Sequence, residues 1–360
     1  MRIAINGMGA GPGASGIGQF ARSALSALAS TASSDALLAI RGTQSLQLDI
    51  PTVEEREVVG CDAWEQLHLP AMLDRWRADV YYSPFLIAPL ACNTPVVVTV
   101  HDAIPVTHPD LTTPEFLAVW QRWVAPSIRA ADHVATVSEG ARCTLVEHGL
   151  AEPAKVSVLR QSVSPRFRPM PIASLRTLLE PYRLEPDRYV LYLGSIEARK
   201  NVATLIRAFL AADTAIPLVL AGHTTRDDPE LVALIASDPV RIRHLGAVSD
   251  DTASGLMAGA RVFVFVSLAE GFGRPLLEAL ASGVPVVASS IPPLQELAAG
   301  AATHVDPDDP AAITRAIERL NSDEGLRAAL RGAGLARAAQ FTPERFAADL
   351  RAIFARAVRS

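Results

Sequence analysis

The sequence lacks the patterns that are typical of several protein classes. Three of its 360 residues are cysteines (Cys61, Cys92 and Cys143), and none belongs to a C-x-x-C pair or has a histidine nearby at metal-ligand spacing. This scarcity predicts free, buried thiols and excludes a disulfide framework. No run of 18 or more apolar residues is free of both charge and proline, so no membrane-spanning helix is expected.

The charge balance excludes further classes. The formal net charge is −5; residues 1–165 hold 11 Lys and Arg against 16 Asp and Glu, and the remaining residues hold 22 of each. Neither a nucleic-acid footprint nor a polybasic surface for anionic lipid is present. The chain opens with MRIAINGMG, a strand and a glycine loop, rather than with a signal peptide. We therefore expect a cytoplasmic protein without a nucleic-acid partner and with at most peripheral contact to the inner face of the membrane.

The composition is that of a large globular chain. At 49% hydrophobic and 20% charged residues, 360 residues exceed the usual size of one domain, so two are expected. Each half opens on an apolar strand followed by glycine, at Met1–Gly7 and at Tyr189–Gly194. The intervening RQSVSPRFRPMP is typical of a linker. We predict an α/β protein with two doubly wound, Rossmann-like parallel-sheet domains at 1–165 and 166–342, followed by a terminal helix at 343–360.

Residues 261–291, RVFVFVSLAEGFGRPLLEALASGVPVVASSI, carry the strongest pattern. A β-branched and aromatic run, Val262–Val266, precedes a polar loop with two glycines. Pro275 suits the first turn of a helix, because proline has no N–H to leave unpaired there. The segment Gly283–Pro285 ends that helix before a second apolar run, Val286–Ala288. This order of strand, loop, helix and strand predicts a βαβ unit in a buried parallel sheet.

The loop of this unit brings polar groups to a helix N-terminus, where backbone N–H groups and the helix dipole favour an anion. Glu270, Gly271, Phe272 and Gly273 precede the helix, and Glu278 lies about one turn inside it. A ligand that lies along this N-terminus can meet both carboxylates. Two glutamates at this spacing are, on their own, more typical of a surface residue and a helix-capping residue than of a ligand site.

The neighbouring residues favour a ligand site. E-GFGRPLL-E, followed by A-x-A-S-G-x-P-V-V-A-S, resembles the E-x7-E signature of family 4 retaining glycosyltransferases. The resemblance covers roughly residues 1–355 and is densest over 189–310. It implies the GT-B arrangement, with two Rossmann-like domains facing a cleft. An N-terminal domain would bind the acceptor, a C-terminal domain would bind the nucleotide-sugar donor, and the last helix would pack back on the first domain.

Two further segments of the second half match the family. Ser195, Arg199 and Lys200 stand in G-S-x-x-x-R-K-N before a helix, where adjacent cations and N–H donors favour a diphosphate whose negative charge grows as it leaves. An exposed Arg-Lys pair alone would more often be a solvated surface. Gly246 and Val248 lie in a segment that resembles L-G-x-V, which is near the nucleobase in the family. Glu278 would, by the same resemblance, accept hydrogen bonds from the ribose hydroxyls.

The first half adds two candidates. Ser15-Gly16 occupies the place of the family's paired glycines near the donor diphosphate, with serine in place of one glycine, so Gly16 is carried over. His101-Asp102 follows the strand expected at Pro95–Val100, at the strand edge where ligands bind in open α/β sheets. A lone histidine there is often only a structural hydrogen-bonding group. The segment T-V-H-D, however, resembles the V-H-D of mannose-transferring members, in which the histidine lies beside the donor sugar. Asp102 is a weaker candidate that could orient the imidazole.

Together with the resemblance, these residues predict a retaining, metal-independent hexosyltransferase without a cofactor. The leading donor is GDP-mannose, with UDP-sugars as the alternative, and the acceptor is a glycan, a polyprenyl-linked glycan or a small molecule. His101, Arg199, Lys200 and Glu270 are the expected catalytic residues, although Glu270 could be either a nucleophile or an electrostatic stabiliser. An epimerase or phosphorylase on the same fold, and a non-catalytic nucleotide-sugar binder, remain as alternatives.

Overall fold

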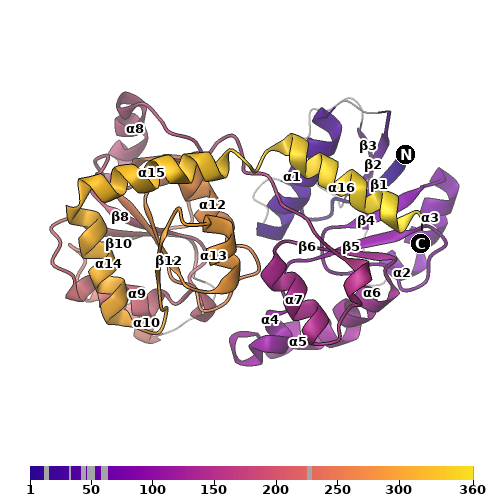
Figure 1. Cartoon of the computed structure of the whole chain (residues 1–360), viewed down its shortest axis with the longest axis horizontal. Helices are drawn as coiled ribbons and strands as arrows, with labels where there is room; N and C mark the ends of the chain where they lie inside the picture. Colours follow the sequence, from indigo (N-terminus) through magenta and orange to yellow (C-terminus); the bar gives the residue numbers. More distant parts are fainter. Residues whose placement is uncertain are drawn as a thin grey trace. The chain divides into compact units, whose positions relative to one another are not determined.

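The computed structural model describes residues 1–11, 16–31, 34–41, 46, 53–57, 64–224 and 229–359, with no side-chain description for 53–57. Ser15 and Cys61 lie outside this part of the chain. The chain divides into two compact units, Met1–Ser162 with Phe341–Ser360, and Val163–Gln340. In each unit, helices lie on both sides of a sheet (Figure 1).

The described residues of the first unit contain a seven-stranded sheet in the order β3-β2-β1-β4-β5-β6-β7. Every neighbouring pair is parallel. The strands are β1 (Arg2–Asn6), β2 (Ala36–Arg41), β3 (Val53–Glu57), β4 (Val80–Ser83), β5 (Val96–Val100), β6 (His133–Thr136) and β7 (Val156–Val158). The helices are α1 (Gly16–Ser30), α2 (Trp64–Leu67), α3 (Leu69–Trp76), α4 (Ile104–Thr107), α5 (Pro114–Val119), the π-helical turn η2 (Trp120–Val124), α6 (Ala125–Ala130), α7 (Glu139–Glu147) and α16 (Pro343–Ala357), with short 3₁₀ turns η1 (Pro109–Leu111) and η3 (Pro153–Lys155).

The second unit repeats this plan with a six-stranded sheet, in the part of the chain described, in the order β10-β9-β8-β11-β12-β13. Its strands are also parallel throughout. They are β8 (Val190–Leu193), β9 (Leu218–Ala221), β10 (Ile242–Gly246), β11 (Val262–Phe265), β12 (Val286–Ser289) and β13 (Thr303–Val305). The helices are α8 (Ile172–Leu179), α9 (Val202–Ala211), α10 (Pro229–Ala236), α11 (Asp250–Gly259), α12 (Arg274–Ala281), α13 (Pro292–Ala298), α14 (Pro310–Ser322) and α15 (Glu324–Ala338), with 3₁₀ turns η4 (Glu180–Tyr182) and η5 (Ala198–Lys200).

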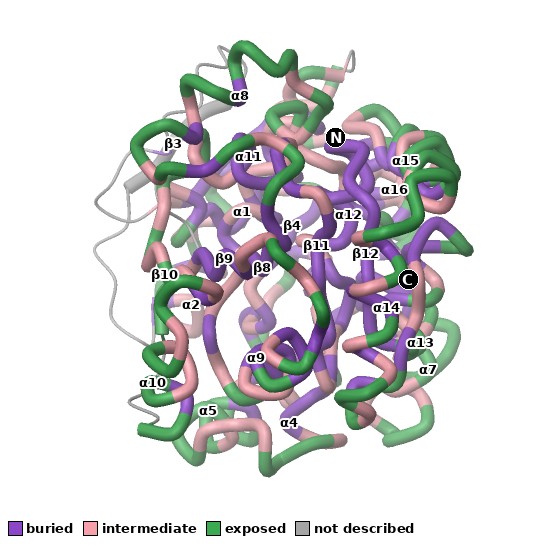
Figure 2. The backbone as a smooth tube through the Cα atoms, turned by 90° about the vertical axis from the view of Figure 1, so that its left-hand side faces the viewer, coloured by how far each residue is buried: buried purple, intermediate pink, exposed green. Residues whose placement is uncertain are grey.

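Both sheets confirm the prediction of two doubly wound parallel sheets. Each has a point at which the strand order reverses, between β1 and β4 in the first unit and between β8 and β11 in the second. The strands on either side of the second reversal are buried along their whole length (Figure 2). Such burial on both faces explains why they read in the sequence as continuous apolar runs.

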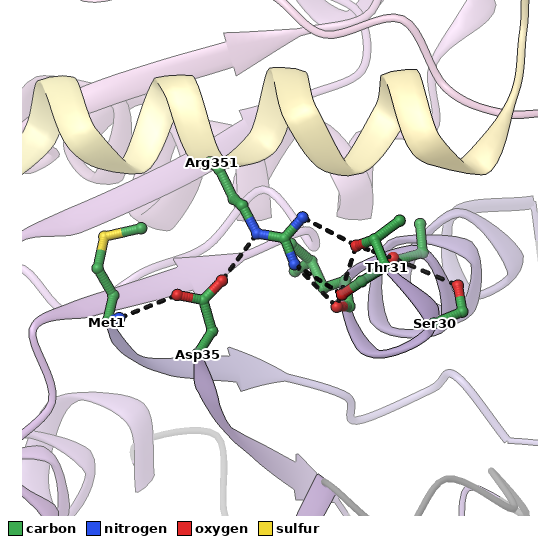
Figure 3. A network of polar contacts seen from close by, with 7 residues as sticks. Met1, Ser30, Thr31, Asp35 and Arg351 are labelled. Carbon is green, nitrogen blue, oxygen red and sulfur yellow. Dashed lines mark hydrogen bonds and ion pairs between the residues drawn. The ribbon is translucent and has the colours of Figure 1, made fainter. Parts of the chain in front are cut away.

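The C-terminal helix α16 belongs to the first unit and packs against α1. Arg351 at its centre donates from Nε to Asp35 Oδ2 (2.7 Å), from Nη1 to Thr31 Oγ1 (2.8 Å) and from Nη2 to the Leu28 carbonyl (3.0 Å). The Met1 amino group bonds the other oxygen of Asp35 at 2.9 Å (Figure 3). The guanidinium therefore ties α16 to the C-terminal end of α1 and to the residue that precedes β2.

Two expectations drawn from what the sequence lacks can be compared with the structure. Cys92 and Cys143 are free cysteines, but Cys92 is only half-buried and Cys143 is exposed on α7, so the prediction of buried thiols was wrong for Cys143 and met only in part for Cys92. Cys143 lies on the solvent side of a surface helix rather than on the face that carries Ala141 and Leu145. Within the described residues, none of the helices has the length and apolar content needed to cross a bilayer.

Candidate functional site

The candidate site lies at the reversal point of the second sheet. Arg199 and Lys200 form the 3₁₀ turn η5, which follows β8, and Glu270 lies in the loop that follows β11. Because β8 and β11 are parallel neighbours, their carboxyl ends meet at the same edge of the sheet. Crevices at such reversal points are where open α/β sheets bind ligands.

Glu270 binds both cations. Its Oε1 lies 2.5 Å from Lys200 Nζ, and its Oε2 lies 3.1 Å from Arg199 Nη1. The carboxylate and the ammonium are nearly buried, with side-chain exposures of 9% and 10%, whereas the guanidinium is 22% exposed. The ammonium also stands 5.1 Å from the centre of the Phe265 ring. A carboxylate with both oxygens paired and little solvent around it fixes the two cations in place.

The backbone holds this arrangement in register. The Leu268 N–H donates to the Arg199 carbonyl (2.9 Å), and Arg199 Nη1 donates to the Ala269 carbonyl (2.9 Å). Asn201 follows the cations in the left-handed region, at φ +58°, and its side chain donates to the Pro307 carbonyl (2.8 Å). Asparagine tolerates this conformation better than most residues, so the turn from η5 into α9 fits the R-K-N sequence.

The cations control the protonation of Glu270. Burial alone would raise the pKa of its carboxyl group, but Lys200 and then Arg199 outweigh burial and hold the pKa below its ordinary value. Glu197 adds a second carboxylate at Arg199, with its Oε1 2.7 Å from Nη2. Two acidic and two basic side chains thus form a charge-balanced cluster. Lys200 has three N–H donors and Glu270 accepts from one, so the ammonium can still donate to an anion.

Helix α12 begins beside this cluster at Gly273, whose φ of +93° lies in the left-handed region. A Cβ at this position would lie 2.2 Å from Leu294 Cδ2, so both the conformation and the space require glycine. Glu278, 7% exposed, bonds Arg274 Nε through Oε1 at 2.8 Å. Burial raises the pKa of the Glu278 carboxyl group, and Arg274 offsets this only in part. The two glutamates of the motif therefore have pKa shifts of opposite sign.

The remaining predicted residues of this unit line the same sheet edge. Half-buried Ser195 follows β8 and accepts a hydrogen bond from Tyr192 Oη at its carbonyl (2.6 Å). Gly246 ends β10 at φ +68° and accepts from the Gly222 N–H (2.8 Å), and half-buried Val248 follows it. Gly271 and Phe272 are buried in the loop before α12. Hence Ser195, Gly246 and Val248 sit at strand ends, whereas Gly271 and Phe272 sit at the start of the helix.

Gly16 and His101 belong to the first unit. Gly16 is the exposed first residue of α1, the helix that follows β1. His101 follows β5 and is half-buried, with Nε2 2.9 Å from the Pro84 carbonyl oxygen. Asp102 Oδ1 accepts a hydrogen bond from the Ile104 N–H (3.1 Å) at the start of α4. His101 thus lies at the carboxyl end of β5, and Gly16 begins the helix that follows β1.

The structure brings Arg199, Lys200 and Glu270 into direct contact and places Glu278 in a separate ion pair on the adjoining helix. Two partners were not predicted from the sequence, namely Glu197 and Arg274. The second could have been found, because Arg274 and Glu278 are four residues apart on a helix and therefore lie on one face. Among the described residues, no group of three or more His, Cys, Asp or Glu side chains is placed to hold a metal ion.

The opposite, amino edge of the second sheet carries a hollow of about 1230 Å³. Residues that precede β8, β11 and β12 line it, including Arg188, Ala260 and Gly283, together with residues of α8 and α15. Neither Glu270 nor the two cations line this hollow. It is therefore separate from the candidate site.

Two family models match the chain: "Glycosyltransferase Family 4" over residues 43–167 and "Glycosyl transferases group 1" over residues 179–337. O-antigen chain mannosyltransferase B of Escherichia coli is 31% identical over 271 residues, which cover 74% of this chain and 71% of that protein. The serotype-specific mannosyltransferase WbdA of E. coli is 29% identical over 70% of this chain, and the match covers 32% of WbdA.

The fold of this chain is similar to that of a solved structure. Anabaena HepE, crystallised in complex with UDP and glucose, superposes with a TM-score of 0.78 and 19% identity, covering 98% of each chain. The sequence matches to both family models and to the mannosyltransferase agree with this likeness. The chain therefore belongs to the family 4 glycosyltransferases and has their GT-B fold.

Proposed function

We propose that this protein is a retaining, metal-independent mannosyltransferase that moves mannose from GDP-mannose to a glycan or lipid-linked acceptor in the cytoplasm. The observation that carries the proposal is the contact of Glu270 with Lys200 and Arg199 at the reversal point of the second sheet. The mannosyltransferases among its relatives support the sugar, as does the V-H-D segment at His101. UDP-sugars remain the alternative donors, because HepE binds UDP.

In this proposal, the second unit binds the donor. Lys200 and Arg199 bind the diphosphate and stabilise the charge that grows on it as the glycosidic bond breaks. Gly271, Phe272 and Gly273 place the first turn of α12 against the same anion, where the helix dipole adds to the attraction. The Glu278 carboxylate accepts hydrogen bonds from the ribose hydroxyls. Ser195, Gly246 and Val248 contact the rest of the nucleotide from the strand ends.

Glu270 acts on the cations rather than as a nucleophile. Both of its oxygens are paired, and attack on the sugar would require breaking at least one buried ion pair. The carboxylate therefore holds Lys200 and Arg199 at the positions where the diphosphate needs them. The acceptor hydroxyl transfers its proton to the departing phosphate oxygen, on the face from which the nucleotide leaves. This route retains the configuration of the sugar and needs no separate base.

The first unit contributes the acceptor side and two donor contacts. Gly16 lets the start of α1 approach the diphosphate closely, because no side chain intervenes. His101 contacts the transferred mannose. The two cations donate charge-assisted hydrogen bonds to the phosphate oxygens and act together with the N–H groups at the start of α12, which supports turnover without Mg²⁺.

The test is a transfer assay with GDP-, UDP- and dTDP-sugars, with Glu270→Ala as the matched inactive variant and EDTA present in a parallel series. We expect transfer from GDP-mannose, no loss with EDTA, and an α-linked product from the α-linked donor by NMR. Transfer from UDP-sugars alone would overturn the assignment of GDP-mannose as the donor. A β-linked product would overturn the retaining mechanism. Turnover by Glu270→Ala at the wild-type rate would remove Glu270 from the site.

A further inference from the structure

The hydrogen bond to Pro84 defines the chemical state of His101. A carbonyl oxygen can only accept, so the proton of the neutral ring resides on Nε2, and Nδ1 presents a lone pair. Burial lowers the pKa of His101, while the Pro84 hydrogen bond and the charge of Asp102 oppose the change in part. No residue that the structure describes donates to Nδ1. This nitrogen is therefore an acceptor suited to a sugar hydroxyl.

Two phenylalanine rings in series pack against the imidazole. The Phe20 ring on α1 meets it edge to face, with centroids 4.7 Å apart and an interplanar angle of 88°. The Phe346 ring on α16 meets Phe20 in turn, with centroids 5.5 Å apart and an angle of 60°. Phe20 is 2% exposed and Phe346 is fully buried, so neither ring can turn away without opening a void. The imidazole is thus held between a hydrogen bond and an edge-to-face contact.

The Phe346 ring is held in place by contacts of α16 that do not involve His101. Arg351, on the same helix as Phe346, is bonded to Asp35, Thr31 and the Leu28 carbonyl, which leaves α16 little freedom to slide along α1. A second buried phenylalanine of α16, Phe354, instead contacts the Tyr82 ring with centroids 5.3 Å apart. Helix α16 therefore carries two equally buried phenylalanine rings, and Phe346 is the one that is connected to His101 through Phe20.

We propose that Phe346 is a positioning residue for the donor site: acting through Phe20, it holds the His101 imidazole on the Pro84 carbonyl and keeps Nδ1 directed to a sugar hydroxyl. This deepens the proposed function, because it rests on His101 contacting the transferred sugar. Helix α16 thereby contributes to donor recognition through the imidazole of His101. The ligand that Nδ1 recognises is a hydroxyl donor, so substituents on the sugar that cannot donate would be rejected.

The test compares two matched variants, Phe346→Leu and Phe354→Leu, by NMR of the imidazole in the free enzyme. The signal of His101 is identified by its loss in His101→Gln, and its pH titration and ¹⁵N shifts report the pKa and the tautomer. In Phe346→Leu we expect the pKa to rise toward the ordinary value of about 6.5 and the Nε2–H tautomer to lose population. Phe354→Leu should leave both unchanged. Phe346→Met, which keeps most of the volume, serves if the leucine variant does not fold.

Equal titration of His101 in wild type and both Phe346 variants would overturn the proposal, as would an equal shift in Phe354→Leu. The measurement contains no donor, so it decides the positioning role even if the enzyme fails to transfer mannose. Kinetics supply the second readout: kcat/KM for GDP-mannose should fall roughly 10- to 100-fold in Phe346→Leu, as expected when a contact group is misplaced. Retention of the wild-type value despite an altered imidazole would overturn the link to donor recognition.

Discussion

Lys200 Nζ and Glu270 Oε1 lie 2.5 Å apart although 70 positions separate the two residues in the sequence. If this ammonium binds the donor diphosphate, Lys200→Met should lower kcat/KM for GDP-mannose at least about 100-fold, the usual cost of losing one stabilising donor. Initial rates and calorimetric binding of GDP measure the effect. Arg207→Met is the control, because it removes a half-exposed cation of α9 that pairs with Glu230. GDP affinity equal to wild type in Lys200→Met would contradict the assignment.

The opposite pKa shifts of Glu270 and Glu278 predict opposite effects of pH on stability. The pKa of Glu270 is lowered in the folded state, so its ionised form stabilises the fold above about pH 4.5 and this contribution is lost as the pH falls. The pKa of Glu278 is raised, so ionisation of this residue destabilises the fold as the pH rises above about 4.5.

Thermal unfolding of Glu270→Gln and Glu278→Gln between pH 3 and pH 7 checks this, because the Glu270 contribution changes below about pH 4.5 and the Glu278 contribution above it. Relative to wild type, the Tm of Glu270→Gln should become lower as the pH rises, and the Tm of Glu278→Gln should become higher. If the difference in Tm from wild type changed with pH in the same way in both variants, Lys200 and Arg199 on one side and Arg274 on the other would not set the two pKa values apart.

Gly222 should tolerate no side chain. A Cβ at this position would lie 1.8 Å from the Gly194 carbonyl oxygen, and the φ of +147° is one that other residues rarely adopt. We expect Gly222→Ala to lower the free energy of unfolding by about 3 kcal/mol, the combined scale of overpacking and backbone strain. Urea denaturation measures it. Gly16→Ala, with nothing within 4 Å of the added carbon, should unfold like wild type; a loss of similar size there would count against the steric explanation.

Arg351→Met should loosen α16 from α1. The variant removes the guanidinium from Asp35 and leaves the Thr31 and Leu28 acceptors without it, which should cost about 1–3 kcal/mol in the free energy of unfolding because the side chain is partly exposed. Arg359→Met, at an exposed residue beyond the end of the helix, is the control. Urea unfolding of both variants gives the comparison, and equal stability of Arg351→Met and wild type would argue against an anchoring role.

The sheet architecture was predictable where strands are buried on both faces. The runs at Val262–Val266 and Val286–Ala288 appear as β11 and β12 because burial requires apolar residues at every position. Strands β2 and β3 fall in residues 30–75, where the mixed sequence has no clear strand pattern. The sequence of β3, VEERE, is mostly charged, which is typical of an edge strand, and β3 lies at the edge of the sheet formed by the described residues.

The site was predictable as a set of residues but not as a set of contacts. Spacing alone placed Glu270 and the cations at strand ends, yet the ion pairs depend on β8 and β11 being neighbours, which no local pattern specifies. Asp102 Oδ1 accepts a hydrogen bond from the Ile104 N–H two residues on, a local turn contact that the V-H-D pattern does not specify. The aromatic contacts of His101 likewise join residues of distant segments.

The division of the chain has a consequence for synthesis. Residues 163–340 form one unit from a continuous stretch, whereas the first unit recruits its last helix from residues translated after that stretch. On the ribosome, the second unit can fold before α16, which carries the ring that contacts Phe20, has been synthesised. The first unit then keeps an uncovered apolar surface until α16 is translated, so it should be completed after the second unit.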